Sequence, residues 1–211
     1  MRRKLFAIRP AASMRGRAFK GLRGWAGKPL HPPLTDIPVA AYVLAAVFDL
    51  VSFLAGGDAE IARDAYTAAT WTIIGGGIVS LGAALTGFWD WLKSTPKYTQ
   101  AWRTANWHMA VMVTVTLVVV VDIVLRLGDY DAPRTPGAVT VLSVLAGILV
   151  AYGALYGGAL VYDYGFNVET SGDHHVWHRS EENLLPGEEP HPDQTPDRAA
   201  RRAGSGSGTR P

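Results

Sequence analysis

Four long apolar segments occupy the middle of the chain, and none shows the polar stripe of a helix on the surface of a soluble protein. Residues 65–89, 104–121 and 135–162 contain no Asp, Glu, Lys or Arg, and residues 37–57 contain only Asp49. Roughly 20 helical residues, each rising about 1.5 Å, cross a hydrocarbon core of about 30 Å. We therefore predict an all-α integral membrane four-helix bundle. Its spans are expected near residues 37–56, 69–91, 104–126 and 138–162.

Basic residues are distributed unevenly around these spans. Residues 1–30 carry nine Lys or Arg and no acid, and the loop 92–103 carries three, whereas the loops 56–68 and 127–137 carry one each. Basic residues in short flanking segments favour the cytoplasmic side of a membrane. We therefore expect a multi-pass protein of the bacterial cytoplasmic membrane with both termini in the cytoplasm.

The two ends of the chain differ in composition from the transmembrane domain, which we place at residues 31–165. Residues 1–30 mix bases with apolar side chains such as Phe19 and Trp25, which suits contact with an anionic lipid leaflet. A disordered leader whose charges only set the topology is the alternative. Residues 166–211 are rich in Pro, Gly, Glu and Arg, and we predict a disordered cytoplasmic tail. We expect no nucleic-acid partner.

Several polar residues should share one depth near the cytoplasmic ends of the helices. They are His31, Asp36, Asp90, Asn106 and His108. We predict that Asp36 is the N-cap of the first span and that Pro38 lies in its first turn. His31 is then left near the membrane surface without a structural role.

Three interpretations of this polar cluster remain open. It could stabilise helix ends through pairing of Asp90 with His108 or a loop base. Alternatively, His31 and His108 could be the axial ligands of haem b, which needs no cysteine in a chain that has none. Histidine and aspartate could also bind a metal ion or relay protons. A separate metal site in the tail could use His174, His175 and His178.

A second polar group lies deeper, towards the other side of the membrane. Asp122 is 14 residues after His108, so both lie near one face of the third span. Arg126 follows Asp122 by four residues and is its expected ion-pair partner, and Asp49 of the first span can join them. A structural ion pair is favoured here over a proton path.

Small residues indicate where helices approach closely. Gly153 and Gly157 form a GxxxG pair in the fourth span, because small side chains allow close backbone contact in lipid. The pair either packs within the bundle or joins two copies of the chain as a homodimer.

Four segments in order give the chain a family resemblance. They are "GKPLHPPLTDIPVAAYVLAAVFDL", "LTGFWDWL", "RTANWHMAV" and "YGGALVYDYGFNV". Over about residues 27–168 the chain resembles the bacterial predicted membrane proteins grouped as domain of unknown function 2231 (DUF2231). The resemblance implies four spans with the histidine of the third at His108. Some relatives carry Rieske-type iron–sulfur domains, which would suit a redox role with a partner protein.

Two functions therefore compete before the structure is considered. The first is a haem- or metal-binding redox component that uses His31 and His108, with no independent catalytic activity. The second is a membrane scaffold or subunit whose polar residues only stabilise helix ends. The visible spectrum of the purified protein would separate them.

Overall fold

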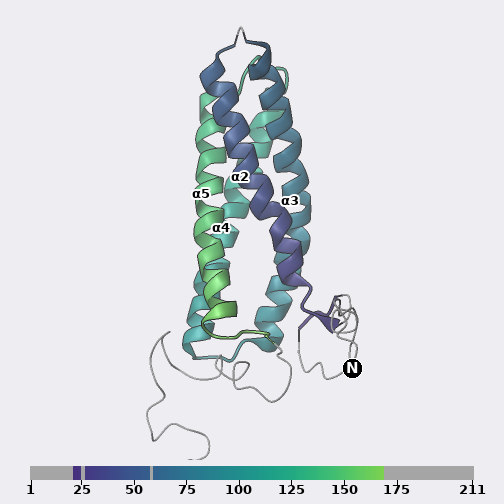
Figure 1. Cartoon of the computed structure of the whole chain (residues 1–211), viewed down its shortest axis with the longest axis vertical. Coiled ribbons are helices and arrows are strands. Elements are labelled where there is room, and N and C mark those ends of the chain that lie inside the picture. The colour runs from purple at the N-terminus through teal and green to yellow at the C-terminus, as the bar shows by residue number, and fades with distance from the viewer. Residues whose placement is uncertain (1–20, 25–26, 58, 169–211) are drawn as a thin grey trace, which may run out of the picture.

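The computed structural model describes residues 21–24, 27–57 and 59–168, and these residues form a bundle of four helices (Figure 1). The helices are α2 (His31–Ala55), α3 (Glu60–Ser94), α4 (Gln100–Gly128) and α5 (Gly137–Tyr162). Each is long and apolar enough to cross a membrane, and α3 is the longest at 35 residues. The predicted four-helix membrane fold is confirmed, and the chain is a multi-pass membrane protein.

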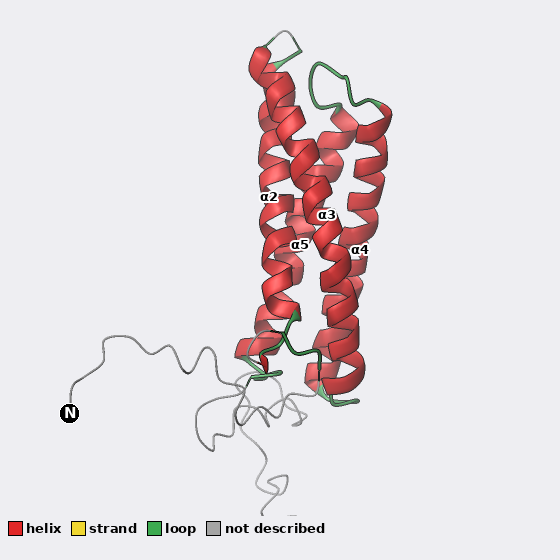
Figure 2. Cartoon of the chain, turned by 90° about the vertical axis from the view of Figure 1, so that its right-hand side faces the viewer, coloured by secondary structure: helices red, strands yellow, loops and turns green. Residues whose placement is uncertain are grey.

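The helices run alternately up and down. We call the end with the start of α2, the α3–α4 connection and the end of α5 the base, and the opposite end the tip (Figures 1 and 2). Helix α2 packs against α3 and α5, and α4 packs against α5 and more sparsely against α3. Both ends of the helical domain therefore lie at the base. Their predicted cytoplasmic location stays a prediction.

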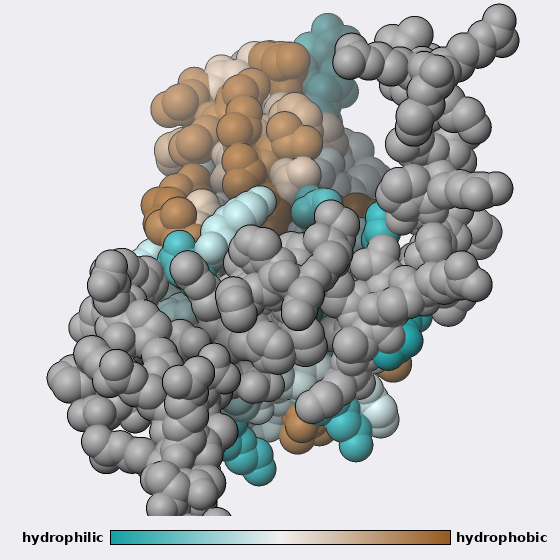
Figure 3. Space-filling model, turned by 60° about the horizontal axis from the view of Figure 1, so that its bottom comes forward, coloured by the Kyte–Doolittle hydropathy of each residue, from teal (hydrophilic) through white to brown (hydrophobic). Residues whose placement is uncertain are grey.

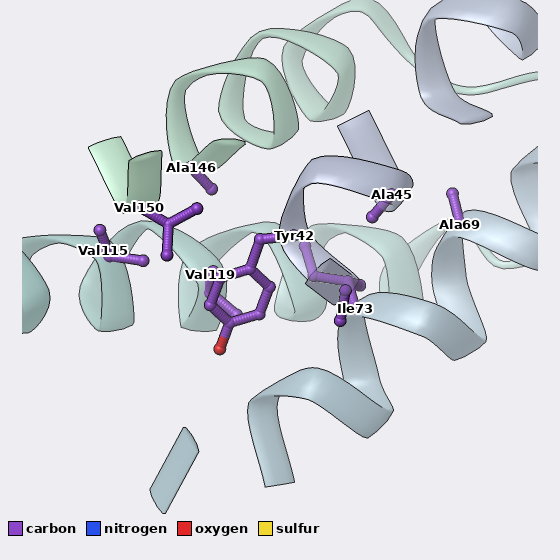
Figure 4. Packing of buried hydrophobic residues seen from close by; sticks show 9 residues of the cluster. Tyr42, Ala45, Ala69, Ile73, Val115, Val119, Ala146 and Val150 are labelled. Carbon is purple, nitrogen blue, oxygen red and sulfur yellow. The ribbon is translucent and has the colours of Figure 1, made fainter. Parts of the chain in front are cut away.

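The core is built from small residues around a few larger ones. Figure 4 shows Tyr42 and Ile73 among three labelled alanines, one each from α2, α3 and α5. The contact between α2 and α3 is especially close at Gly76, where an added Cβ would lie 2.6 Å from the Cβ of Ala41. Close backbone approach is how helices gain packing energy in lipid, where no hydrophobic force drives them together.

The outward faces of the helices are strongly apolar. Large hydrophobic side chains on all four helices are exposed; examples are Leu54, Leu85, Leu117 and Leu155. Figure 3 shows hydrophobic side chains in brown over the flank of the bundle and hydrophilic ones in teal nearer its ends. Such a continuous apolar surface is compatible with lipid rather than water around the helices.

The start of α2 differs from the prediction. The helix begins at His31, its N-cap is Leu30 without a side-chain hydrogen bond, and prolines occupy its first turn. The N-cap prediction for Asp36 is wrong, because that residue lies inside the helix and is exposed. Pro38 is also inside the helix rather than in its first turn. The adjacent Pro32 and Pro33 explain the early start, since proline has the right φ for a first turn and its missing N–H costs nothing there.

Two predictions concern segments that are largely outside the described residues. They are the membrane-surface role of residues 1–30 and the disorder of residues 166–211 with the histidines His174, His175 and His178.

Candidate functional site

His31, the first residue of α2, packs against α3. Its Nδ1 donates a hydrogen bond of 2.9 Å to the carbonyl oxygen of Ala83. The ring lies against Gly87, one turn further along α3, where an added Cβ would come within 2.6–3.0 Å of three ring atoms. The absence of a side chain at Gly87 is therefore what lets the imidazole lie on the surface of α3.

His108 on α4 is held in the same way by α5. Its Nδ1 donates a hydrogen bond of 2.9 Å to the carbonyl oxygen of Gly153. The ring lies next to Gly157, again one turn further along, where an added Cβ would be 3.3 Å from Cε1 of the ring. Each histidine thus donates a hydrogen bond to a backbone carbonyl of the neighbouring helix and packs its ring against a glycine four residues further along that helix.

These hydrogen bonds determine the protonation of both neutral rings. A carbonyl oxygen only accepts, so Nδ1 carries the hydrogen and Nε2 keeps its lone pair. Metal-bound histidines are typically oriented by this same bond from the second ring nitrogen to a backbone carbonyl. In both rings Nε2 is therefore the nitrogen with a lone pair; that of His31 lies beside Gly87, 3.0 Å from where an added Cβ would be.

The two histidines lie at one level of the bundle. His108 is eight residues from the start of α4, and Ala83 is 11 residues from the end of α3. At about 1.5 Å per residue, this level is about 12 to 16 Å from the helix ends at the base. The two histidines thus lie at a similar level, and their joint use as a site stays a prediction.

The other predicted members of this cluster have structural partners. Asp90 is buried and accepts a hydrogen bond of 3.0 Å from the backbone N–H of Leu22. Leu22 lies in the segment before α2, where its carbonyl accepts a hydrogen bond of 3.0 Å from the backbone N–H of Leu30. Asp90 therefore fixes the chain leading to His31, in place of the predicted pairing with His108 or a loop base.

Asn106 and Asp36 also lie apart from the imidazoles. The side-chain oxygen of Asn106 accepts a hydrogen bond of 2.8 Å from Nε1 of Trp91, which ties the end of α3 to the start of α4. Asp36 is exposed on α2. Of the five residues predicted at this level, only His31 and His108 have geometry suited to a ligand.

A second buried site lies near the tip. Arg126 of α4 donates from Nε to Asp122 at 2.6 Å and from Nη1 and Nη2 to the two oxygens of Asp49 on α2. All three side chains are fully buried. The pairing agrees with the spacing of Asp122 and Arg126 and brings in Asp49 as predicted.

Further polar residues surround this ion cluster. Thr135, in the α4–α5 connection, donates to Asp49 at 3.0 Å, and Thr70 of α3 lies 3.4 Å from Nη1 of Arg126. The Arg126 guanidinium lies 5.7 Å from the ring centre of Tyr66. Sequence reasoning missed these residues because a threonine or tyrosine in an apolar segment carries no signal of what it faces. The same is true of Gly87, a small residue without a recognisable spacing.

Gly153 and Gly157 lie between α5 and α4 of the same chain. An added Cβ at Gly153 would lie 2.6 Å from Sδ of Met112, and Gly157 contacts His108. Packing within the bundle accounts for the pair, and association of two copies through it stays a prediction.

Comparison with known proteins agrees with this architecture. A family model described as "Predicted membrane protein (DUF2231)" matches residues 27–170. The chain belongs to this family. The DUF2231 match covers all four helices and both histidines. No curated protein and no solved structure matches the chain.

The ligand set available in this DUF2231 chain is small. Within residues 21–24, 27–57 and 59–168, no group of three or more His, Cys, Asp or Glu side chains is placed to hold a metal ion. The described site at the base consists of two imidazoles. Two protein ligands are also what a six-coordinate b-type haem takes from a protein.

Proposed function

We propose that the chain is a membrane redox component in which His31 and His108 would hold a b-type haem. The observation that carries the proposal is the repeated arrangement of each Nδ1 on a backbone carbonyl, with Nε2 left to ligate. Haem held by two histidines would accept and release one electron at its iron. The residues of this chain would hold it and orient the imidazoles.

The location of the histidines supports this assignment. Each imidazole is attached to a different helix pair, His31 to α2 and α3, and His108 to α4 and α5. The contact between α3 and α4 is the sparsest between sequential helices. The two pairs also meet where α2 packs against α5, so a planar group held by both imidazoles would displace the least packing on the α3–α4 side.

The competing function is a membrane scaffold without a cofactor. Its support is that Asp90 and Asn106, predicted members of the same cluster, hold Leu22 and Trp91 in place. These bonds organise the base of the bundle and bind no ligand. The two functions differ in whether the histidines carry a chromophore.

Visible spectroscopy of the full-length protein tests the proposal. We expect the detergent-purified chain, produced with haem supplied, to show a Soret band and, after reduction, the sharp α band of low-spin haem. His31→Ala and His108→Ala should each lose these bands, because each removes one axial ligand. His174→Ala is the matched control and should keep them.

Helical content measured by circular dichroism must stay unchanged in the same variants. A colourless wild-type protein, or full haem content in both His31→Ala and His108→Ala, would refute the haem assignment in favour of the scaffold.

Substitution of the supporting glycines provides a graded test. Gly87→Ala places a Cβ within 2.6–3.0 Å of the His31 ring, whereas Gly157→Ala places one at 3.3 Å from His108. Because changes that disturb ligand orientation typically cost 10–100-fold in affinity, we expect Gly87→Ala to weaken haem binding about 10-fold or more, and Gly157→Ala to weaken it less. Haem titration of the apoprotein measures both.

Gly75→Ala is the control for this series, since no atom lies within 4 Å of its added Cβ. Equal haem affinity in Gly87→Ala, Gly157→Ala and Gly75→Ala would contradict the proposed role of the glycines.

A further inference from the structure

The buried cluster at the tip contains more acids than bases. Asp49, Asp122 and Arg126 each have a side chain with 0% exposure. Two carboxylates and one guanidinium sum to a charge of −1. A net charge without solvent contact is costly in an apolar interior, where a titratable group is neutralised instead. The balance therefore requires one further positive charge, which a single proton provides.

Hydrogen bonds are shared unequally between the two acids. Asp49 accepts three: one from Nη1 of Arg126 at 3.0 Å, one from Nη2, and one from Thr135 at 3.0 Å. Asp122 accepts one short bond at Oδ1, 2.6 Å from Nε, while its Oδ2 is 3.5 Å from Nη2. Donors stabilise an ionised carboxylate, so the less supported oxygen, Oδ2 of Asp122, is where a proton costs least.

Among the described residues, no base other than Arg126 makes a hydrogen bond or ion pair with the cluster. Arg63 of α3 makes bonds to the carbonyls of Tyr130 and Ala132 and an ion pair with the exposed Asp131. Arg134 donates to the carbonyl of Phe53. Helix α5 (Gly137–Tyr162) contains no Lys, Arg, Asp or Glu, and the one basic residue of α2, His31, lies at its start, towards the base of the bundle.

The remaining neighbours are neutral or exposed to solvent. The hydroxyl of Tyr66 on α3 donates a hydrogen bond of 3.1 Å to the backbone carbonyl of Asp129. Asp129 is exposed. Neither group compensates the excess negative charge of the cluster. The described neighbours of the cluster on the surrounding helices therefore leave its net charge at −1.

A buried hydroxyl at the same level provides an independent observation. Ser143 of α5 is fully buried, and its Oγ has no hydrogen-bond partner among the described residues. It lies one turn from Gly147, which contacts Ala46 of α2, so it is at the level of Asp49. Buried hydroxyls normally have a hydrogen-bond partner, so this level of the bundle holds a polar group that the described side chains do not satisfy.

From these observations we infer that the ion cluster is a proton-binding site in which Oδ2 of Asp122 holds one proton while Asp49 and Arg126 form the two-pronged ion pair. Binding of the proton changes the charge of the cluster from −1 to 0 and breaks no covalent bond. The site is separate from the histidines and does not depend on haem. It goes beyond the proposed redox function by placing an exchangeable proton near the tip.

Infrared spectroscopy of the full-length protein in detergent at neutral pH tests the inference. The wild-type spectrum should contain the carbonyl stretch of a protonated carboxyl that shifts in D₂O. Subtracting the spectrum of Asp122→Asn should isolate one such band. Asp36→Asn, which changes an exposed acid, is the control and should leave the band in place.

Thermal unfolding provides a second readout. Asp122→Asn resembles the protonated acid and should keep the unfolding midpoint of the wild type, whereas Asp49→Asn removes the two-pronged partner of Arg126 and should lower it. Absence of an Asp122-dependent band would overturn the inference. Equal destabilisation by Asp122→Asn and Asp49→Asn would also overturn it.

Discussion

Arg126→Met is expected to destabilise the folded bundle by about 3–5 kcal/mol, the usual cost of removing one partner from a buried ion pair. The substitution leaves Asp49 and Asp122 buried with no cation in contact, since Arg126 is the only base bonded to either within the described residues. Chemical or thermal unfolding in detergent, followed by circular dichroism, measures the effect. Yield of folded protein should fall with it.

Two variants make this prediction specific. Arg134→Met removes a base at the same end whose bond to the Phe53 carbonyl is exposed, and it should change stability little. The combined Asp49→Asn, Asp122→Asn and Arg126→Met protein should recover much of the lost stability, because no buried charge remains. Wild-type stability in Arg126→Met alone would show that the cluster contributes nothing to the fold.

Gly76→Leu is expected to separate α2 from α3 and to lower the free energy of unfolding by about 1–3 kcal/mol or more, as overpacked cores do. Even the first carbon of the new side chain would lie 2.6 Å from Cβ of Ala41 and 3.1 Å from the ring of Tyr42. A Cβ cannot rotate away, so the backbones must move apart. Unfolding midpoints in detergent would register this loss.

The neighbouring glycine supplies the control for this substitution. Gly75→Leu adds the same side chain on the same helix, but nothing lies within 4 Å of its Cβ. It should therefore leave stability nearly unchanged, with a gain from the lower flexibility of the unfolded chain. If Gly76→Leu and Gly75→Leu were equally stable, the close contact of α2 with α3 would not contribute to folding.

The fold was accessible from the sequence because hydrophobic length is a direct physical requirement of a lipid-spanning helix. The four apolar segments became α2 to α5; α3 and α4 extend beyond the predicted spans at both ends, α2 starts six residues earlier, and α5 agrees to within one residue. The start of α2 was misplaced because Asp36 satisfies the usual N-cap rule, whereas Pro32 and Pro33 form a first turn equally well. Local rules of this kind do not determine which of two adjacent starts packs better.

The depth of the two histidines could be predicted from the sequence, whereas their contacts could not. Counting residues from the ends of helices placed His31 and His108 at one depth, which the helix levels reproduce. Each Nδ1 binds a carbonyl four residues before a glycine on the neighbouring helix. This contact depends on how the neighbouring helices are rotated about their own axes. That rotation is set by tertiary packing and cannot be read from a single sequence.

The ion cluster was more accessible because its core is local. Asp122 and Arg126 are one turn apart on α4, so their pairing follows from helix geometry. Asp49 joins from a helix 77 residues away, and Thr135 joins from a connection. A buried carboxylate in an apolar span needs a charged partner, and this made the pairing of Asp49 predictable. A threonine hydroxyl can be satisfied within its own helix, so the contact of Thr135 was not predictable.

The length of α3 has a consequence for the position of the bundle in the bilayer. Its 35 residues span about 52 Å, which exceeds a hydrocarbon thickness of about 30 Å by some 22 Å. Its charge-free stretch, residues 65–89, spans only about 37 Å, and the charged residues beyond it, Asp90 and Lys93 at the base among them, favour protrusion of the helix ends through the lipid headgroups. Because the imidazoles lie about 12 to 16 Å from the helix ends at the base, protrusion of those ends would bring the two rings closer to the headgroup layer.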